Sequence, residues 1–464
     1  MQKARQSRQV NREVLKQAIS DYNALLDEEK LKQSSLDELE SRLDEAKLIF
    51  GGRKLCPYLR PHFVLESDWK RVSEIGNLIW NSLQKVKEAA ITSEEILDEL
   101  GMTEIERDLI SIDPGYVQVS PTARLDSFLT DDSYSYVELN GESPAGIAYS
   151  DSARDIFFEL PVMRKFMEKY ELIGLEGRTK LHDTLLSCYD EYRGGSSDER
   201  PTVGIVDLKG LPTQQEFELC KDFFEAKGTP SIICSPDELS HRDGGLYCGD
   251  TKIDLVYRRL LVNEYLPIID EHPALANAYR AGDVCVANSF RAKLIHKKAS
   301  FAVLTDEKYA GLFDKEELQA IRDHIPWTRM VSETVTDHYG EEIDLLEWTL
   351  ANKDRLALKP NDDYGGHGIF IGWVSSDDEW KDAVGIALEN GDYLVQERVK
   401  TAKETFPYID AEGNVHMTES LVDLDPMLFN GEVGSAFTRL STTELANVTS
   451  GGGMVPTIIL RDSD

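Results

Sequence analysis

The sequence predicts a mixed fold of class α+β or α/β, in which a helical N-terminal region precedes strands and a small parallel sheet. Apolar residues at helical spacing dominate the first hundred residues, and a strand–helix–strand pattern begins near residue 201. The 464 residues are enough for two to four domains or subdomains. With 41% hydrophobic and 29% charged residues, the composition is typical of a globular protein with a sizeable core.

Residues 1–112 are expected to form the helical region. Apolar spacing predicts one pair of helices within the first 50 residues, where Ser35 and Glu38 are spaced as in a capping box. A second helical pair is expected over 66–101, with Gly101 at its end.

Strands and turns begin near residue 113, and a region over 113–200 is expected to open the core. Residues 134–140, YSYVELN, alternate as a half-buried strand should. Helix is expected again over 151–192, and the polar stretch 194–202 is typical of a linker.

Residues 201–283 are expected to form a βαβ subdomain, because VGIVDL, QQEFELCKDFFEAKG and SIICSP give strand, helix and strand. IDLVYRRLL adds a further strand. Residues 284–464 form the last region, with a helix over DDEWKDAVGIALENG. Its expected strands are LALKP, GIFIGW, YLVQERV and LVDLDPMLFNGEVGSAF, the last broken by a turn at Asn430-Gly431.

The charge of the chain excludes several kinds of partner. Lys and Arg number 51 and Asp and Glu number 84, which gives a net charge of −33 at pH 7. Such an excess repels nucleic-acid phosphates and anionic lipids, so we expect no nucleic acid and no membrane surface as partner. A phosphorylated ligand would need a local cluster of Lys and Arg.

Location and redox state follow from what the sequence lacks. No apolar run approaches the roughly 20 residues that span a bilayer, and no apolar segment of a signal peptide follows the basic start. The six cysteines include no CxxC pair and are expected to be reduced thiols. We expect a cytoplasmic protein; its oligomeric state leaves no mark on the sequence.

The segment LALKPNDDYGGHGIFIGW carries the clearest chemical signal. A short strand delivers Lys359, and a polar turn with Gly365, Gly366 and Gly368 leads into a second strand. Such a loop lets backbone N–H groups approach phosphate oxygens, Lys359 would add a positive charge, and Asp363 could hold Mg²⁺. The alternative is a plain β-hairpin with a solvated lysine.

A second signal lies on the strand that contains Glu138 and Asn140. Residues two apart on a strand face the same side, and a carboxylate beside an amide oxygen suits Mg²⁺. The alternative is a solvent-facing strand edge.

Three weaker signals follow along the chain. Lys297 and Lys298 open a helix-like stretch, the end of YLVQERV could contact an adenine, and Arg439 precedes a polar loop that ends in three glycines. The alternatives are two solvated lysines, a core strand and a mobile surface loop.

Together these motifs resemble the circularly permuted ATP-grasp ligases, such as eukaryotic glutathione synthetase and glutathionylspermidine synthetase, over roughly 113–464. In the common ATP-grasp order both ATP lysines precede the Glu-x-Asn pair. Here Glu138 and Asn140 come first, which is typical of the permuted branch. The likeness is closest to uncharacterised members of that branch, and it implies an ATP-grasp fold.

The resemblance implies roles for single residues. Lys359 and one of Lys297 and Lys298, for which we favour Lys298, would bind ATP. The residues implied to hold Mg²⁺ are Glu138, Asn140 and Asp363. The glycines implied to cover the phosphates are Gly365, Gly366 and Gly368, and those implied to lie along the adenine are Gln396, Glu397 and Val399.

The resemblance also implies the reaction. Arg124, Arg259 and Arg439 resemble arginines that bind the substrate or the transferring groups. Residues 201–283 would bind the substrate and 284–464 the nucleotide, with loops 365–368 and 450–453 as lids. Tyr364 and His367 depart from the glycine-rich pattern of the loop.

The implied enzyme is an ATP- and Mg²⁺-dependent ligase. It would join small-molecule carboxylate and amine substrates through an acyl phosphate. Two alternatives stay open: a non-catalytic module that binds a nucleotide or a partner protein, and a phosphoryl transferase on the same fold.

Overall fold

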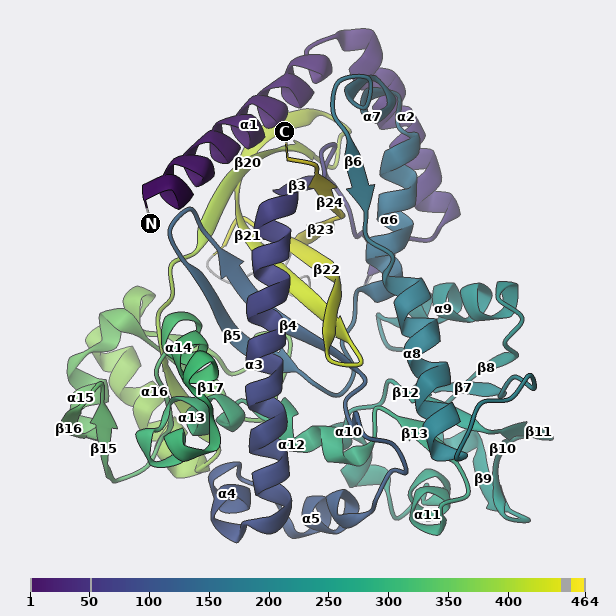
Figure 1. The fold of residues 1–464 in the computed structure, drawn as a ribbon, viewed down its shortest axis with the longest axis vertical. Coiled ribbons are helices and arrows are strands. Elements are labelled where there is room, and N and C mark those ends of the chain that lie inside the picture. Colours follow the sequence, from purple (N-terminus) through teal and green to yellow (C-terminus); the bar gives the residue numbers. More distant parts are fainter. Residues whose placement is uncertain (1, 51, 444–451, 463–464) are drawn as a thin grey trace.

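A central antiparallel sheet organises the molecule, and the computed structural model describes residues 2–50, 52–443 and 452–462 (Figure 1). In spatial order its strands are β23 (Gly453–Val455), β22 (Glu432–Ser441), β21 (Val415–Phe429), β4 (Thr122–Leu129) and β5 (Tyr134–Asn140), and β20 (Ala402–Ile409) pairs with β21. The expected strand at 134–140 and the expected break at Asn430-Gly431 are confirmed, and both turn residues have the positive φ of a tight hairpin.

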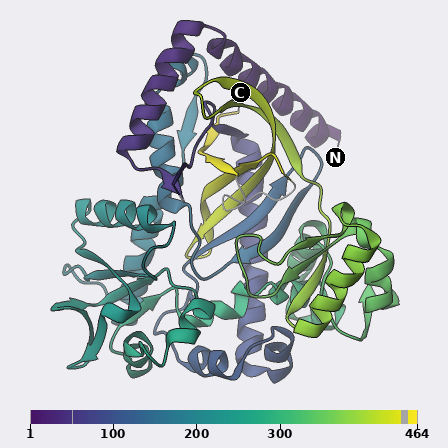
Figure 2. The ribbon, with the colours of Figure 1, turned by 180° about the vertical axis from the view of Figure 1, so that it is seen from behind.

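The two faces of this sheet differ because side chains alternate along each strand. Leu125, Leu139 and Leu424 point to one face and pack against the apolar side of the long helix α3 (Glu66–Thr92), which crosses the sheet in Figure 1. Figure 2 turns the opposite face of the sheet toward the viewer, and the strand registers place charged and amide side chains on that face. They are Arg124, Asp126, Glu138, Asn140, Asp423, Asp425 and Arg439.

Of the N-terminal helices, α1 (Gln2–Leu26) and α2 (Glu29–Glu45) lie at one end of the molecule and α3 crosses the face of the sheet (Figure 1). The two helical pairs are confirmed as α1 with α2, and α3 with α4 (Glu94–Glu99). The capping box expected at Ser35 is wrong. The helix begins at Glu29, nearly two turns earlier, so Ser35 is buried within α2, where its hydroxyl accepts the backbone N–H of Val162.

A four-stranded parallel sheet lies beside the central sheet (Figure 1). Its order is β13 (Cys285–Ala287), β12 (Leu255–Arg258), β7 (Val203–Val206) and β8 (Ser231–Cys234), and α9 (Gln214–Ala226) connects the last two. The expected βαβ unit is confirmed, and the sheet also takes in β13, which lies beyond residue 283. Asp207 and Arg259 follow the carboxyl ends of β7 and β12, the edge where open parallel sheets bind ligands.

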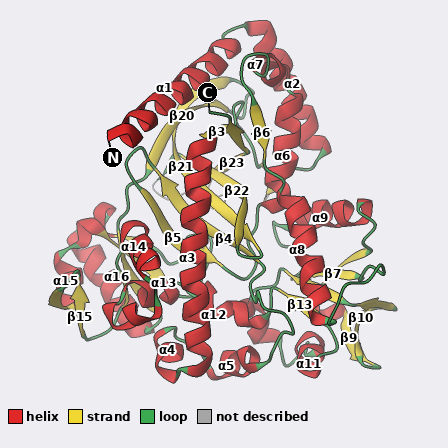
Figure 3. Cartoon of the chain, in the orientation of Figure 1, coloured by secondary structure: helices red, strands yellow, loops and turns green. Residues whose placement is uncertain are grey.

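A small antiparallel sheet lies beside the central sheet, on the flank opposite the parallel sheet (Figure 3). Its order is β14 (Thr328–Met330), β19 (Tyr393–Glu397), β17 (Leu356–Pro360) and β18 (Phe370–Ile371), and α16 (Asp377–Asn390) packs on it through Trp380. The hairpin expected around the glycine-rich turn is confirmed, because Ala357 of β17 pairs with Ile371 of β18.

The remaining elements connect these sheets or form smaller sheets of their own. The helices are α5 (Glu104–Ser111), α6 (Ile147–Glu159), α7 (Pro161–Phe166), α8 (Gly177–Tyr192), α10 (Val262–Tyr265), α11 (Ala274–Ala281), α12 (Lys293–His296), α13 (Ala299–Thr305), α14 (Lys315–His324) and α15 (Leu345–Ala351). The strands are β1 (Ile49–Phe50), β2 (Arg53–Lys54), β3 (His62–Leu65), β6 (Leu172–Gly174), β9 (Leu239–Arg242), β10 (Gly245–Cys248), β11 (Thr251–Ile253), β15 (Val335–His338), β16 (Glu341–Asp344) and β24 (Thr457–Leu460).

Three further sequence-based expectations concern membrane-spanning helices, the cysteines and the second glycine-rich loop. Among the helices of the described residues, none combines the length and apolar character needed to cross a bilayer. All six cysteines are free. The second expected lid, 450–453, lies partly outside the described residues, since its Gly452 and Gly453 are described and its first two residues are not.

Candidate active site

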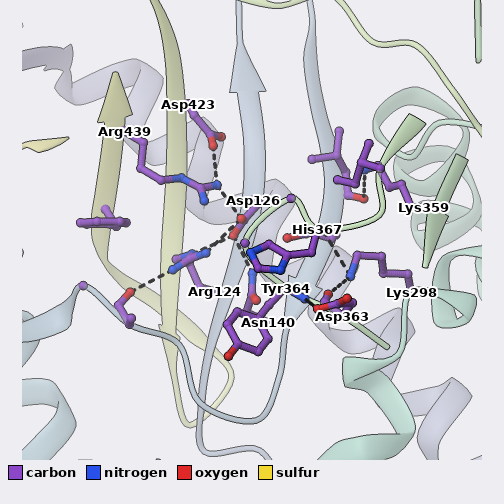
Figure 4. A pocket seen from close by; sticks show the side chains of 18 of the residues that line it. Arg124, Asp126, Asn140, Lys298, Lys359, Asp363, Tyr364, His367, Asp423 and Arg439 are labelled. Atoms are coloured by element: carbon purple, nitrogen blue, oxygen red, sulfur yellow. Dashed lines mark hydrogen bonds and ion pairs between the residues drawn. The ribbon is translucent and has the colours of Figure 1, made fainter. Parts of the chain in front are cut away.

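A cavity of about 470 Å³ lies against the charged face of the central sheet. Its walls also come from the ends of β7 and β12 and from the glycine-rich loop after β17 (Figure 4). The volume is in the range of small-molecule sites. All site residues predicted from the sequence line the cavity except Lys297 and Gly368. Those that line it are Arg124, Glu138, Asn140, Arg259, Lys298, Lys359, Asp363, Gly365, Gly366, Gln396, Glu397, Val399 and Arg439.

The two adjacent lysines point in different directions. They lie between α12 and α13, and the Lys298 ammonium donates to the backbone carbonyl of Asp363 and lies 3.7 Å from a Glu138 carboxylate oxygen. The Lys297 ammonium instead donates to the Gly101 carbonyl at 2.6 Å and to Glu106 at 2.9 Å, in a buried ion pair outside the cavity. The geometry therefore favours Lys298 as the lysine that meets a ligand.

Lys359 is a half-buried cation on the cavity wall. Its ammonium donates to the Gln396 side-chain oxygen at 2.8 Å and to the Val137 carbonyl at 3.4 Å. Burial lowers the pKa of Lys359, and the nearby carboxylate of Glu138 acts in the opposite direction. An anionic ligand in the cavity would stabilise the charged ammonium of Lys359 and so oppose the effect of burial on its pKa.

The glycine-rich loop is folded over the cavity. Gly365, Gly366 and Gly368 all have φ between 67° and 78°, the left-handed region that glycine adopts without strain. A side chain at Gly368 would meet Pro360 at 2.8 Å, so this glycine serves packing at the base of the loop. The Tyr364 hydroxyl donates to Glu264 of α10 at 2.7 Å, and this bond links the loop to the parallel-sheet layer.

Three oxygen donors predicted to hold a metal line the cavity. Glu138 and Asn140 share one face of β5, and Asp363 belongs to the glycine-rich loop. The Asn140 amide nitrogen donates to Asp126 at 2.9 Å, which leaves its oxygen without a partner among the described residues. Two carboxylates and an amide oxygen form a hard donor set that fits Mg²⁺.

The wall expected to lie along an adenine is formed by the end of β19. The Glu397 carboxylate accepts the Tyr339 hydroxyl at 2.8 Å, lies 3.1 Å from the His338 ring nitrogen and pairs with Arg355. Because this carboxylate already has three partners, contacts with a base would come from the main chain at 397–399.

Sequence reasoning missed a buried carboxylate cluster on the floor of the cavity. Asp126, Asp423 and Asp425 each have a carboxylate oxygen within 4.8 Å of the others. Arg124 holds Asp126 through two hydrogen bonds of 2.7 and 3.0 Å, and Arg439 contacts all three carboxylates. The two guanidiniums take the place a metal would have here. The alternation of side chains along residues 124–126 and 422–425 could have shown that these aspartates and Arg124 face the same side of the sheet.

The protonation of this cluster follows from its charge balance. Three carboxylates face two guanidiniums, so full ionisation leaves one buried negative charge in excess. Burial raises the pKa of Asp425 well above its ordinary value and also raises that of Asp423. Burial acts on Asp126 too, but Arg124 and Arg439 outweigh it and lower the pKa of that carboxyl. A proton held by the Asp423–Asp425 pair therefore balances the cluster.

The cavity also reaches the carboxyl edge of the parallel sheet. Arg259 donates to the Pro144 carbonyl at 2.7 Å and lies 3.6 Å from the buried Glu216 carboxylate. Asp207, which the sequence analysis did not single out, lines the cavity beside it, and burial raises the pKa of Asp207 to about 7 despite the opposing charge of Arg259. His296 is a further lining residue that sequence reasoning missed.

No protein-family model and no curated protein sequence matches the chain. A glutathione synthetase-like effector from Globodera pallida, solved in the apo form, is similar in structure, with a TM-score of 0.58 and 13% identity over 92% of this chain and 96% of that chain. For a γ-glutamylcysteine synthetase-like protein from Methylobacillus flagellatus the TM-score is 0.40 and the sequence identity 9%, over 83% of this chain and 86% of that chain. For a RimK domain ATP-grasp protein from Sphaerobacter thermophilus the TM-score is 0.28 and the sequence identity 14%, over 56% of this chain and 90% of that chain.

The likeness to the effector spans nearly the whole of both chains, so it concerns the complete architecture rather than one sheet. At 13% identity it establishes the fold and not the activity. The chain therefore has an ATP-grasp-like fold.

Proposed function

We propose that the chain is an ATP- and Mg²⁺-dependent carboxylate–amine ligase of the circularly permuted ATP-grasp branch, acting on small molecules through an acyl phosphate. One observation carries this proposal. Segments far apart in the sequence bring Lys298, Lys359, the Glu138–Asn140 pair and Asp363 to the wall of one cavity. In a chain of net charge −33, the two lysines would supply the local positive charge that a phosphorylated ligand needs, and the carboxylates beside them would need a divalent cation to tolerate the phosphates.

The nucleotide end of the cavity lies at the lysines. Lys298 and Lys359 would neutralise phosphate oxygens, and the glycine-rich loop would offer backbone N–H groups to them. Glu138, Asn140 and Asp363 would hold Mg²⁺, which when bound supplies charge neutralisation to the phosphates.

The substrate end lies at the arginines, on the other side of the cavity in Figure 4. Arg124 and Arg439 are held by the buried aspartates, which balance their charge, and they would offer oriented guanidinium N–H donors at the place where a carboxylate receives the phosphoryl group. Arg259 and Asp207, of opposite charge at one edge, suit a substrate that carries both an ammonium and a carboxylate. The loop closed by Tyr364 would keep water from the acyl phosphate.

The test is an assay for ADP and free phosphate with ATP, Mg²⁺ and pooled carboxylates and amines. The expected result is ADP release that requires one member of each pool, with an equal amount of free phosphate. Glu138→Gln should abolish it. Glu432→Gln, at the exposed start of β22, is the matched control and should leave it intact.

The other outcomes separate the competing functions. ADP release with phosphate retained on the product identifies a phosphoryl transferase. Nucleotide binding with no ADP release from any pair identifies a non-catalytic module. A chain that binds no ATP at millimolar concentration overturns the proposal.

A further inference from the structure

His296 occupies an unusual position for a histidine at the end of a short helix. It closes α12, lies two residues before Lys298, and is 8% exposed while lining the cavity. Its ring nitrogen Nδ1 accepts the backbone N–H of Gly141 at 3.3 Å. Gly141 directly follows Asn140, so this histidine lies where the expected metal strand meets the ATP lysine.

The Gly141 contact fixes the tautomer of the ring. A backbone N–H can only donate, so Nδ1 must be unprotonated, and the proton of the neutral ring is on Nε2. Burial lowers the pKa of His296 to about 4, with Glu142 and Asp362 opposing and Lys293 and Lys298 adding to the effect. The ring is therefore neutral near pH 7.

The Nε2–H group is left for a ligand. Among the described residues it has no hydrogen-bond partner, and it is absent from the polar atoms sealed off from solvent. Since His296 lines the cavity, this donor opens onto it. A protonated nitrogen cannot coordinate a metal ion, so the geometry favours an anionic oxygen as its partner.

We propose that His296 is a further catalytic residue, whose Nε2–H donates a hydrogen bond to the phosphoryl group that passes from ATP to the substrate carboxylate. The proposal rests on the proposed function. The proton stays on Nε2 throughout, and the donor complements Lys298 without adding a charge. Fixed donors aimed at developing negative charge typically contribute a factor of about 10²–10³ to kcat.

Two nearly isosteric variants separate this role from a structural one. In His296→Asn the amide reaches only the Nδ1 position, so the contact with Gly141 is kept and the donor is lost. In His296→Gln the amide reaches the Nε2 position, so the donor is kept and the Gly141 contact is lost. Their kcat and their dissociation constants for Mg-ATP and Mg-ADP are compared with those of the wild-type chain.

A donor role predicts a specific pattern. His296→Asn should lower kcat on the order of 10²-fold and weaken ATP about tenfold while the ADP dissociation constant stays unchanged. His296→Gln should come within about tenfold of the wild-type kcat. A wild-type-like Asn variant overturns the proposal, as does an equal loss in both variants, because either result shows that the Nε2 donor is dispensable.

The design also separates failure of this inference from failure of the proposed function. If the wild-type chain releases no ADP from any substrate pair, the ligase proposal fails. The ATP-to-ADP affinity ratio of the two variants, measured without substrates, then still tests the donor. An unchanged ratio in His296→Asn overturns the inference even in a fully active ligase.

Discussion

Replacing Arg439 with methionine should destabilise the central sheet strongly. The Arg439 guanidinium pairs with Asp126, Asp423 and Asp425, and the side chains of these carboxylates are at most 3% exposed. In Arg439→Met only Arg124 remains to balance them, so a cluster that one bound proton balances in the wild-type chain gains an excess of one buried negative charge.

The magnitude follows from the burial of the partners. Removing one member of a buried ion network costs about 3–5 kcal/mol, because the remaining charges stay desolvated. A typical protein has about 5–15 kcal/mol of total stability, so the loss is large. Without Arg439 the pKa of Asp126 rises. When the pKa of a carboxyl is raised in the folded state, the protein loses stability as pH increases. The loss in free energy of unfolding caused by Arg439→Met is therefore largest near pH 8 and becomes smaller toward pH 4.

Urea unfolding at pH 8 and pH 4.5, followed by tryptophan fluorescence and circular dichroism, measures both effects. Arg461→Met is the matched control, since Arg461 pairs with Glu171 at 2.7 Å on the surface and its loss should cost less than about 1 kcal/mol. Adding Asp423→Asn to Arg439→Met should recover part of the stability. A deficit under about 1 kcal/mol at pH 8, or one that does not narrow in acid, refutes the reasoning.

Three further predictions concern the cavity and its loop. Lys298→Gln should raise the Kd of ATP on the order of tenfold, whereas Lys297→Gln should leave that Kd unchanged and lower the unfolding temperature; calorimetric titration and thermal unfolding distinguish them. Because burial raises the pKa of Asp207 to about 7, stability is lost as pH rises toward 7. The stability gain of Asp207→Asn over wild type should therefore grow by about 2–3 kcal/mol between pH 5 and pH 8 in urea titrations, and a constant gain contradicts this. Tyr364→Phe, which loses the bond to Glu264, should raise amide hydrogen exchange in loop 361–368 about fivefold; unchanged exchange would show that the bond does not hold the loop.

The parts of the fold that the sequence predicted well are those with a local pattern. The strand at 134–140 alternates, and the turn after Phe429 contains an Asn-Gly pair, so each could be located from neighbouring residues alone. The glycine-rich hairpin is also local, because Lys359 and its glycines lie within ten residues.

What the sequence did not reveal depends on contacts between distant segments. Asp423 matters because Arg439 and Asp126 face it across strands, and neither partner is visible from its own neighbours. The choice between Lys297 and Lys298 rests on the break between two short helices, which sets their directions. His296 has no motif around it, and its role comes from the backbone of Gly141, far away in the sequence.

The pairing of β4 with β21 also sets a timetable for biosynthesis. Ser127 of β4 donates its backbone N–H to Asp425, a residue 298 positions later. At about 5–20 residues per second, a ribosome needs roughly 15–60 s to cover that distance. During this interval the nascent β4–β5 hairpin has an unpaired edge, and part of the apolar side of α3 stays uncovered. The cavity can be completed only after β21 and β22 have been synthesised, so the emerging chain depends on protection from aggregation until β21 arrives.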